Sequence, residues 1–176
     1  MAVRVQDILE QTFVPLLNSL DAILAKAELF AEERQVDLVN ARLTPDMFTL
    51  AQQVQIATYF ARETPRRLQG HAAAPDIGEP ATTLDGMRRQ VSDALEALSA
   101  LSPADFDGAE AQQCTIEPTG LDLYFDMTGE PFLLRWSLPN FHFHVTVAYA
   151  ILRKEGLDIG KRDYLGSFDA FRRMKS

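Results

Sequence analysis

The stretch PNFHFHVTVAYAILRKEGLDIGKRDYLG, residues 139–166, carries two of the three histidines of the chain inside a helical pattern of apolar residues. The pattern runs from Asn140 to Glu155, and Gly156 follows as a typical left-handed helix cap. Successive side chains of a helix rotate by about 100 degrees, so His142 and His144 point about 200 degrees apart. The two histidines therefore cannot hold one ion together from a regular helix.

The apolar side chains of this helix gather around the direction of His144, with Asn140 one turn before it, so we expect His144 to point inward. An inward histidine is either a core residue hydrogen-bonded to a neighbouring helix or a metal ligand. A zinc ion would need two or three further ligands. The preceding helix offers no histidine, only Gln52, Gln53, Gln55 and Thr58.

A second, polar stripe of the same helix contains His142, Thr146, Tyr149 and Arg153. This stripe is either a solvated or interhelical face, or a small-molecule site in which Arg153 clamps a carboxylate or phosphate. Tyr149 and His142 would then serve as hydrogen-bonding or proton-transfer groups. The segment after Gly156, with Lys161, Arg162 and Asp163, lacks the spacing of a phosphate loop and is predicted to pack back onto the helices as a loop.

Three further helices are predicted upstream. Apolar residues at three- and four-residue steps indicate one long helix from Val5 to Phe30, bent only modestly by Pro15. Thr44 as N-cap and Pro45 at the first helical position predict a second helix that ends near Glu63, before Pro65. Thr83 is predicted to cap a third helix that ends near Pro103.

The second helix has two apolar faces, because Ile56, Tyr59 and Phe60 lie opposite its main stripe. Two apolar faces need two partners. Either the helix is buried between neighbours of its own bundle, or its second face forms a homodimer contact.

Irregular structure and a hairpin are predicted between the helices. Residues 70–81 hold two prolines and two glycines and should form a connection, with His71 on the surface or at the helix end. Between Gln112 and Met127, alternating residues flank the turn-forming Pro118-Thr119-Gly120 and indicate a short hairpin in which Cys114 is a small apolar filler. Glu130 to Leu138 is predicted to be helical, with a kink or break at Pro139.

Composition limits the class of protein. A chain of 176 residues, 47% of them hydrophobic, suits one domain, residues 1–176. A net charge of -8 and a pI near 4.8 argue against a nucleic-acid surface. The chain shows neither a secretory signal nor a membrane span, and its one cysteine fits a reducing compartment, so we expect a cytoplasmic protein.

The run FHVTVAYAILRKEGLDIGKRDYLG, with DMFTLAQQVQIA at residues 46–57 and LPNF at 138–141, resembles an uncharacterised bacterial family, a domain of unknown function with the number one-nine-nine-three. That family lies within the DinB-like, YfiT-like helical bundles. The resemblance implies an all-α four-helix bundle with a short hairpin before the last long helix, commonly dimeric. Some relatives hold a divalent metal with three histidines and carry out thiol-dependent transfer or isomerisation.

In those relatives the last helix carries two histidines four residues apart, then a glutamine and a Leu-Arg pair before a glycine. Placing Leu152-Arg153 on that pair puts His144 at the second histidine and Asn140 at the first, while Val147 replaces the glutamine. The histidine of the second helix has no counterpart. The resemblance thus implies a metal site of which His144 alone is retained.

Three functions are compatible with these observations. We favour a dimeric small-molecule-binding protein with a degenerate metal site, no bound metal, and a pocket lined by His142, His144, Tyr149, Arg153 and Asn140. The alternatives are a transferase-like enzyme that depends on a divalent metal such as zinc or nickel, held by His144, and a purely structural homodimer joined through Ile56 and Phe60.

Overall fold

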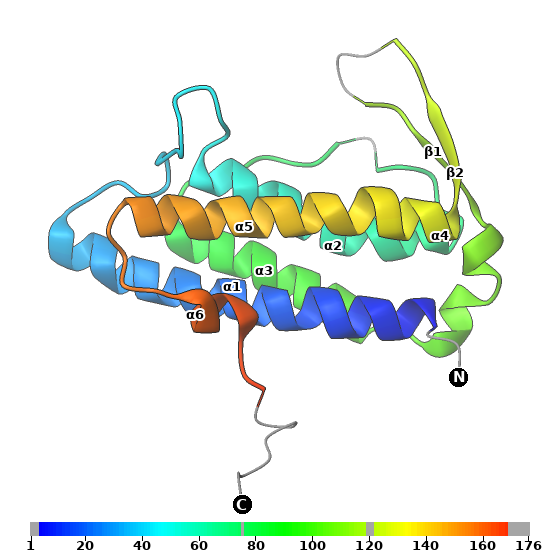
Figure 1. The fold of residues 1–176 in the computed structure, drawn as a ribbon, viewed down its shortest axis with the longest axis horizontal. Helices are drawn as coiled ribbons and strands as arrows, with labels where there is room; N and C mark the ends of the chain where they lie inside the picture. Colours follow the sequence, from blue (N-terminus) through cyan, green and yellow to red (C-terminus); the bar gives the residue numbers. More distant parts are fainter. Residues whose placement is uncertain (1–3, 75, 119–121, 169–176) are drawn as a thin grey trace, which may run out of the picture.

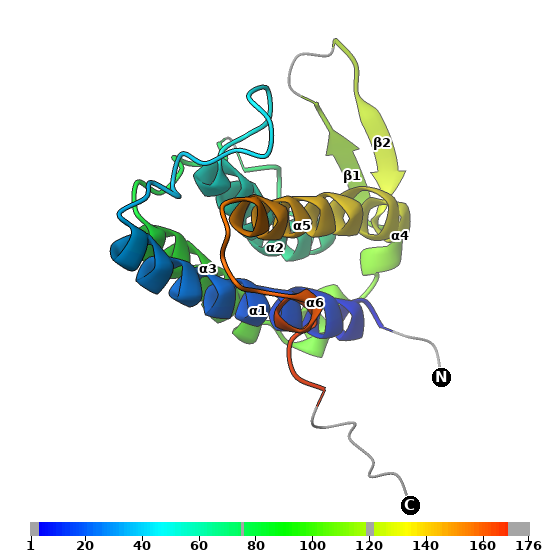
Figure 2. The same ribbon diagram turned by 60° about the vertical axis from the view of Figure 1, so that its left-hand side comes forward.

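A computed structural model describes residues 4–74, 76–118 and 122–168 of the chain. Its four long helices run nearly side by side (Figure 1, Figure 2) and are α1 (Val5–Arg34), α2 (Leu50–Leu68), α3 (Leu84–Ser99) and α5 (Leu138–Lys154). Helix α2 packs against α5 and α3, and α1 packs against α3 and α5. The predicted all-α four-helix bundle is confirmed.

The core fills the space between these helices. The apolar stripe of α1 is buried along its length, and Phe13 meets Phe141 of α5 with ring centroids 4.4 Å apart. Pro15 lies inside α1 and does not end it, as predicted. Full burial of a large apolar side chain stabilises a fold by roughly 1.5–3 kcal/mol, so the buried rings of Phe13 and Phe141 stabilise the packing of α1 on α5.

Both predicted ends of α2 are wrong. The helix begins after Thr49, whose Oγ1 accepts a hydrogen bond from the N–H of Gln52 at 3.2 Å, while the Gln52 side chain accepts from the N–H of Thr49 at 3.0 Å. This reciprocal capping box satisfies two free donors of the first turn. Thr44 lies in a preceding turn. The helix then continues through Pro65 to Leu68, which is buried.

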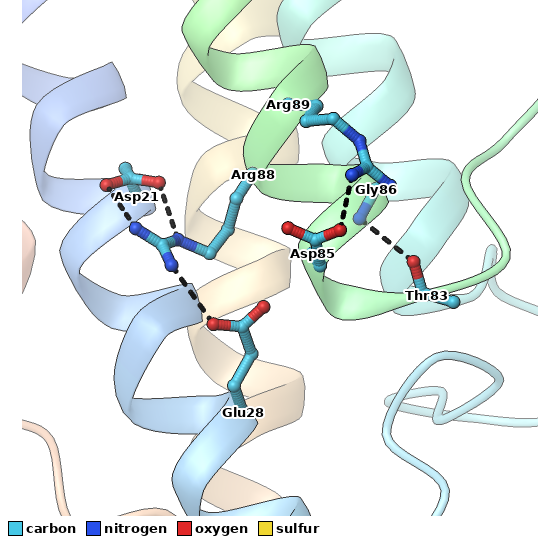
Figure 3. A network of polar contacts seen from close by, with 7 residues as sticks. All are labelled: Asp21, Glu28, Thr83, Asp85, Gly86, Arg88 and Arg89. Atoms are coloured by element: carbon cyan, nitrogen blue, oxygen red, sulfur yellow. Dashed lines mark hydrogen bonds and ion pairs between the residues drawn. The ribbon is translucent and has the colours of Figure 1, made fainter.

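Helix α3 begins after Thr83, whose Oγ1 accepts from the N–H of Gly86 at 2.9 Å, as predicted. Figure 3 shows how α3 is tied to α1: the Arg88 guanidinium reaches both Asp21, at 2.8 and 3.2 Å, and Glu28, at 3.0 Å. Hydrogen bonds to these two carboxylates raise the pKa of Arg88. The contact fixes the register of α3 on α1.

The predicted hairpin is confirmed. Strands β1 (Gln113–Ile116) and β2 (Phe125–Thr128) pair antiparallel, with Cys114 opposite Met127. Cys114 is buried, as expected of a filler. Of the predicted turn, Thr119 and Gly120 lie outside the described residues. The hairpin projects sideways from one end of the bundle, near α4 (Figure 1), and is preceded by two short 3-10 turns, η1 (Pro103–Phe106) and η2 (Ala109–Ala111).

The chain leaves the hairpin through a tight contact. A single turn, α4 (Gly129–Pro131), follows β2, and a Cβ on Gly129 would lie 1.8 Å from the carbonyl oxygen of Ala109. Only glycine allows this approach. It joins the foot of the hairpin to the η2 turn.

Of the kink or break predicted at Pro139, the break is wrong, and an irregular turn lies directly before the proline. Residues Phe132–Ser137 form a π-helix, η3, which runs without interruption into α5. The N–H of Leu138 donates to the carbonyl of Leu133, five residues back. Because Pro139 lacks an N–H and its ring crowds the preceding turn, a wider turn before it lets the helix continue.

The end of α5 agrees with the prediction. Gly156 has a φ of +95°, and the N–H of Leu157 donates to the carbonyl of Leu152 at 3.0 Å. The following segment packs back onto the bundle, but as the short helix α6 (Lys161–Leu165) rather than as a loop. Lys26 of α1 holds Asp163 at 2.5 Å. Among the described residues, no helix has the length and apolar character of a membrane span.

Candidate functional site

His144 points into the bundle, as predicted, and is 7% exposed. Its Nδ1 lies 2.7 Å from Oε1 of Gln53 on α2. The Gln53 amide nitrogen donates to the carbonyl of Phe48 at 3.4 Å, which assigns the amide oxygen to His144. Nδ1 of His144 therefore carries the proton, and Nε2 is left as an acceptor.

Burial keeps His144 neutral. Desolvation lowers the pKa of His144 to about 4, because the charged imidazolium would lose its hydration inside the bundle. The imidazole stacks with Phe60 of α2, at 6.5 Å between ring centroids, and meets Phe143 edge-on at 5.2 Å. At neutral pH this side chain is an uncharged hydrogen-bond donor to α2.

The donors around His144 do not fit the three-histidine metal centre that the family resemblance implies. Asn140, at the first histidine position, donates its amide N–H to the carbonyl of Trp136 on its own helix at 2.7 Å. Gln53 faces His144 from α2, and a glutamine amide is a poor substitute for a neutral imidazole ligand. In residues 4–74, 76–118 and 122–168, no three His, Cys, Asp or Glu side chains gather in a metal-binding group.

The polar stripe of α5 lies on another face, against α6. Tyr149 meets Tyr164 of α6 edge-on at 5.8 Å, and the hydroxyls of Thr146 and Tyr164 are 3.0 Å apart. His142 is half-buried beside Phe141, and burial lowers the pKa of His142. The stripe therefore contacts α6 through Thr146 and Tyr149 and is otherwise half-buried or exposed.

Arg153 ends this stripe and is exposed. Its Nη1 donates to the carbonyl of Leu157, past the end of α5, at 3.4 Å. The five predicted site residues are therefore not gathered in one place. His144 faces α2, and Asn140 is hydrogen-bonded to its own helix. The other three, His142, Tyr149 and Arg153, lie along the polar stripe of α5. A ligand-binding role for them stays a prediction.

A cavity of about 700 Å³ lies elsewhere, between α2, the connection after it, the hairpin and the π-helix η3. We call it the hairpin cleft. It is lined by three groups of side chains: the aromatic residues Tyr59, Phe60, Tyr124, Phe132 and Trp136, the charged residues Glu63, Arg67, Asp76 and Glu117, and a set of small or aliphatic residues that includes Ile56, Ala73 and Ile77. Its volume is that of a small-molecule site.

The π-helix positions one wall of the hairpin cleft. Phe132 and Trp136 both belong to η3, and the hydroxyl of Ser137 hydrogen-bonds to Thr64 of α2, which fastens η3 to that helix. π-Helical turns occur frequently at functional sites. Phe60 connects the cleft with His144, because one ring both lines the cleft and stacks on the imidazole.

Two charged side chains of α2 are buried at this cleft. Glu63 is 5% exposed and Arg67 is 9% exposed. Nη2 of Arg67 donates to the carbonyl of Thr115 in β1 at 2.6 Å, and its guanidinium lies 5.7 Å from the centre of the Phe132 ring. Oε1 of Glu63 accepts from the N–H of Ala74 at 2.9 Å. These bonds hold the hairpin and the connection after α2 around the cleft.

Sequence reasoning missed this cleft. Because α2 was predicted to end at Glu63, Arg67 was assigned to the following connection, where a charged side chain is normally exposed to solvent. The available signal was that Glu63 and Arg67 are four residues apart and so share one helix face. His71 lies at the end of the helix and is exposed, as expected.

Comparisons with known proteins agree with this architecture. The family described as "Domain of unknown function (DUF1993)" matches residues 6–165. A crystal structure of a DinB family member protein from Shewanella denitrificans superimposes with a TM-score of 0.78 and 39% sequence identity, covering 92% of this chain and 93% of the other. No curated protein matches this chain.

Proposed function

Because this chain belongs to the DUF1993 family and is DinB-like in fold, we propose that it is a small-molecule-binding protein whose site is the hairpin cleft. The cavity of about 700 Å³, with aromatic walls and two buried charges, carries the proposal. Sites of this kind combine a largely apolar lining with a few placed polar groups. The cleft has both features.

The proposal includes no resident metal. Two contacts support this part: His144 is hydrogen-bonded to Gln53, and Asn140 donates to a carbonyl of its own helix, at the two positions where the family resemblance implies histidine ligands. Elemental analysis of protein purified without an affinity tag tests this part, with His144→Ala as the comparison. Stoichiometric zinc or nickel that disappears in the variant would instead support the metal-dependent transferase.

Trp136 allows a direct binding test, because it is the single tryptophan of the chain and lines the cleft. Naphthoate, naphthylmethanol and naphthylmethylammonium are suitable flat probes. At least one should change the Trp136 fluorescence in a saturable way. Ala73→Phe should weaken that binding, because Ala73 is an exposed residue at the cleft and a phenyl ring there would fill part of it.

The matched control for the cleft-filling variant is Ala72→Phe. Ala72 is equally exposed, precedes Ala73 in the connection and does not line the cleft. It should bind as the unchanged protein does. Absence of a saturable response to all three probes, or equal weakening by both variants, would remove the hairpin cleft as the site.

A homodimer remains part of the proposal. Ile56 and Phe60 of α2 are half-buried and line the cleft, so a partner that uses them would cover its mouth. Phe60→Glu should then shift the mass measured by light scattering from dimer to monomer. A mass that does not change would refute an interface at this helix.

A further inference from the structure

The geometry of the hairpin cleft points to the chemical class of its ligand: an organic monocarboxylate, held at its charge by Arg67 and at its flat apolar body by the aromatic walls. This inference rests on the proposed function and adds the ligand's charge to it.

Arg67 is nine-tenths buried, yet no carboxylate of the described residues forms an ion pair with it. One of its five N–H groups is used by the carbonyl of Thr115, and its guanidinium plane has the Phe132 ring beside it. A buried charge is destabilising unless it is paired and hydrogen-bonded. An unpaired guanidinium at the wall of a cavity is therefore matched by an anion inside that cavity.

Glu63 does not serve as this anion, although it lies one helical turn before Arg67. Its Oε1 accepts from the N–H of Ala74 at 2.9 Å, and its Oε2 lies 3.4 Å from Nε of Arg66. Both carboxylate oxygens thus have other partners, one of them the cation Arg66. The carboxylate of Glu63 is therefore paired with Arg66 and Ala74, and it forms no ion pair with Arg67.

The rim of the cleft limits the ligand to a single negative charge. Asp76 and Glu117 line the cleft and are exposed. Together with Glu63, they repel an anion in proportion to its charge, so a doubly charged phosphate ester meets about twice the repulsion that a monoanion meets, and solvent screens the part that comes from the exposed Asp76 and Glu117. A carboxylate also matches the planar fork of an arginine.

The aromatic side chains of the hairpin cleft favour a flat apolar body for the ligand. Phe60, Phe132 and Trp136 come from two facing elements, α2 and η3, and Tyr124 comes from the hairpin. Aromatic faces bind flat apolar groups by stacking and by removing their surface from water. A body about the size of a naphthalene ring suits a cleft of about 700 Å³.

The three naphthalene probes separate the ligand's charge from its shape. On the unchanged protein at neutral pH, the Trp136 titration should give naphthoate an affinity at least about tenfold above that of naphthylmethanol, which is the gain from one charge-assisted hydrogen bond. Naphthylmethylammonium should bind more weakly than either. Raising the salt concentration should weaken naphthoate binding only slightly, because the contact is buried.

Arg67→Met should remove this preference, because methionine retains most of the side-chain volume without the charge. The matched control is Arg89→Met, which removes an exposed arginine of α3 that does not line the cleft. It should keep the full preference for naphthoate. If Arg67→Met does not fold, the ranking of the three probes on the unchanged protein still decides the question.

Each outcome has a definite meaning. Equal affinities for naphthoate and naphthylmethanol, with binding still weakened by Ala73→Phe, would overturn the carboxylate inference and leave the cleft as a site for neutral molecules. Strongest binding of naphthylmethylammonium would overturn it in favour of cations held by Glu117 and the aromatic faces. Loss of naphthoate binding in Arg153→Met would move the anion site to the stripe on α5.

Discussion

Acid should destabilise this protein through one histidine. His144 is neutral in the folded chain, with its pKa lowered to about 4, and it regains an ordinary pKa near 6.5 when the chain unfolds. Between these two values the unfolded state binds the proton and the folded state does not. The free energy of unfolding contributed by this group is therefore full above about pH 6.5 and falls as the pH drops towards about pH 4.

The size of the effect follows from the two pKa values. Lowering the pH from about 7.5 to about 5 should reduce the free energy of unfolding by about 2 kcal/mol through His144 alone. Denaturant unfolding at the two pH values measures the total change, which also includes carboxylates. The difference between the unchanged protein and His144→Gln isolates the contribution of this imidazole.

The glutamine variant keeps an amide N–H for Gln53 and removes the titrating group. Its stability should therefore depend less on pH, by about 2 kcal/mol over this interval. His142→Gln is the matched control on the same helix; His142 is only half-buried, so its effect should be smaller. If His144→Gln shows the same pH dependence as the unchanged protein, the imidazole is not buried and neutral as described.

Two further changes test the framework around the cleft. Gly129→Ala should lower the free energy of unfolding by about 3 kcal/mol or more, because its Cβ would lie 1.8 Å from a backbone oxygen. Gly160→Ala is the control, because its Cβ would have no atom nearer than 4.0 Å, and it should be nearly neutral in the same thermal unfolding assay. Arg88→Met should lower the free energy of unfolding, measured with denaturant, by about 1 kcal/mol, because it removes the ion pairs to two carboxylates of α1. Added salt should reduce this effect. Arg89→Met removes a single exposed ion pair and should lower the free energy of unfolding by less. Equal effects within either pair would contradict the contacts described.

Periodicity predicted the elements whose signals are local. Helices α1, α3 and α5, the inward direction of His144 and the cap at Gly156 all follow from residues within one or two turns of each other. Two prolines misled the prediction. Pro65 is accepted within α2 because the turn beyond it places Arg67 and Leu68 in buried positions.

The site was harder to predict because no single segment contains it. Helix α2, the hairpin and η3 each contribute a wall, and only tertiary packing joins Arg67 to Thr115. The prediction placed the site in residues 139–166 because that stretch holds two of the three histidines of the chain. In the structure His144 contacts Gln53, while the hairpin cleft is a separate cavity that shares only the Phe60 ring with this contact.

The π-helix before Pro139 makes this part of the chain tolerant of a change in length. A regular α-helix advances by about 100 degrees for each residue, so one extra residue would normally rotate everything on one side of it by that angle, whereas a π-turn takes up the extra residue and leaves its two flanks aligned. Deleting one residue within Phe132–Ser137 should therefore return the turn to regular winding while His144 keeps its direction. The same deletion between Ser137 and His144 would turn the imidazole away from Gln53.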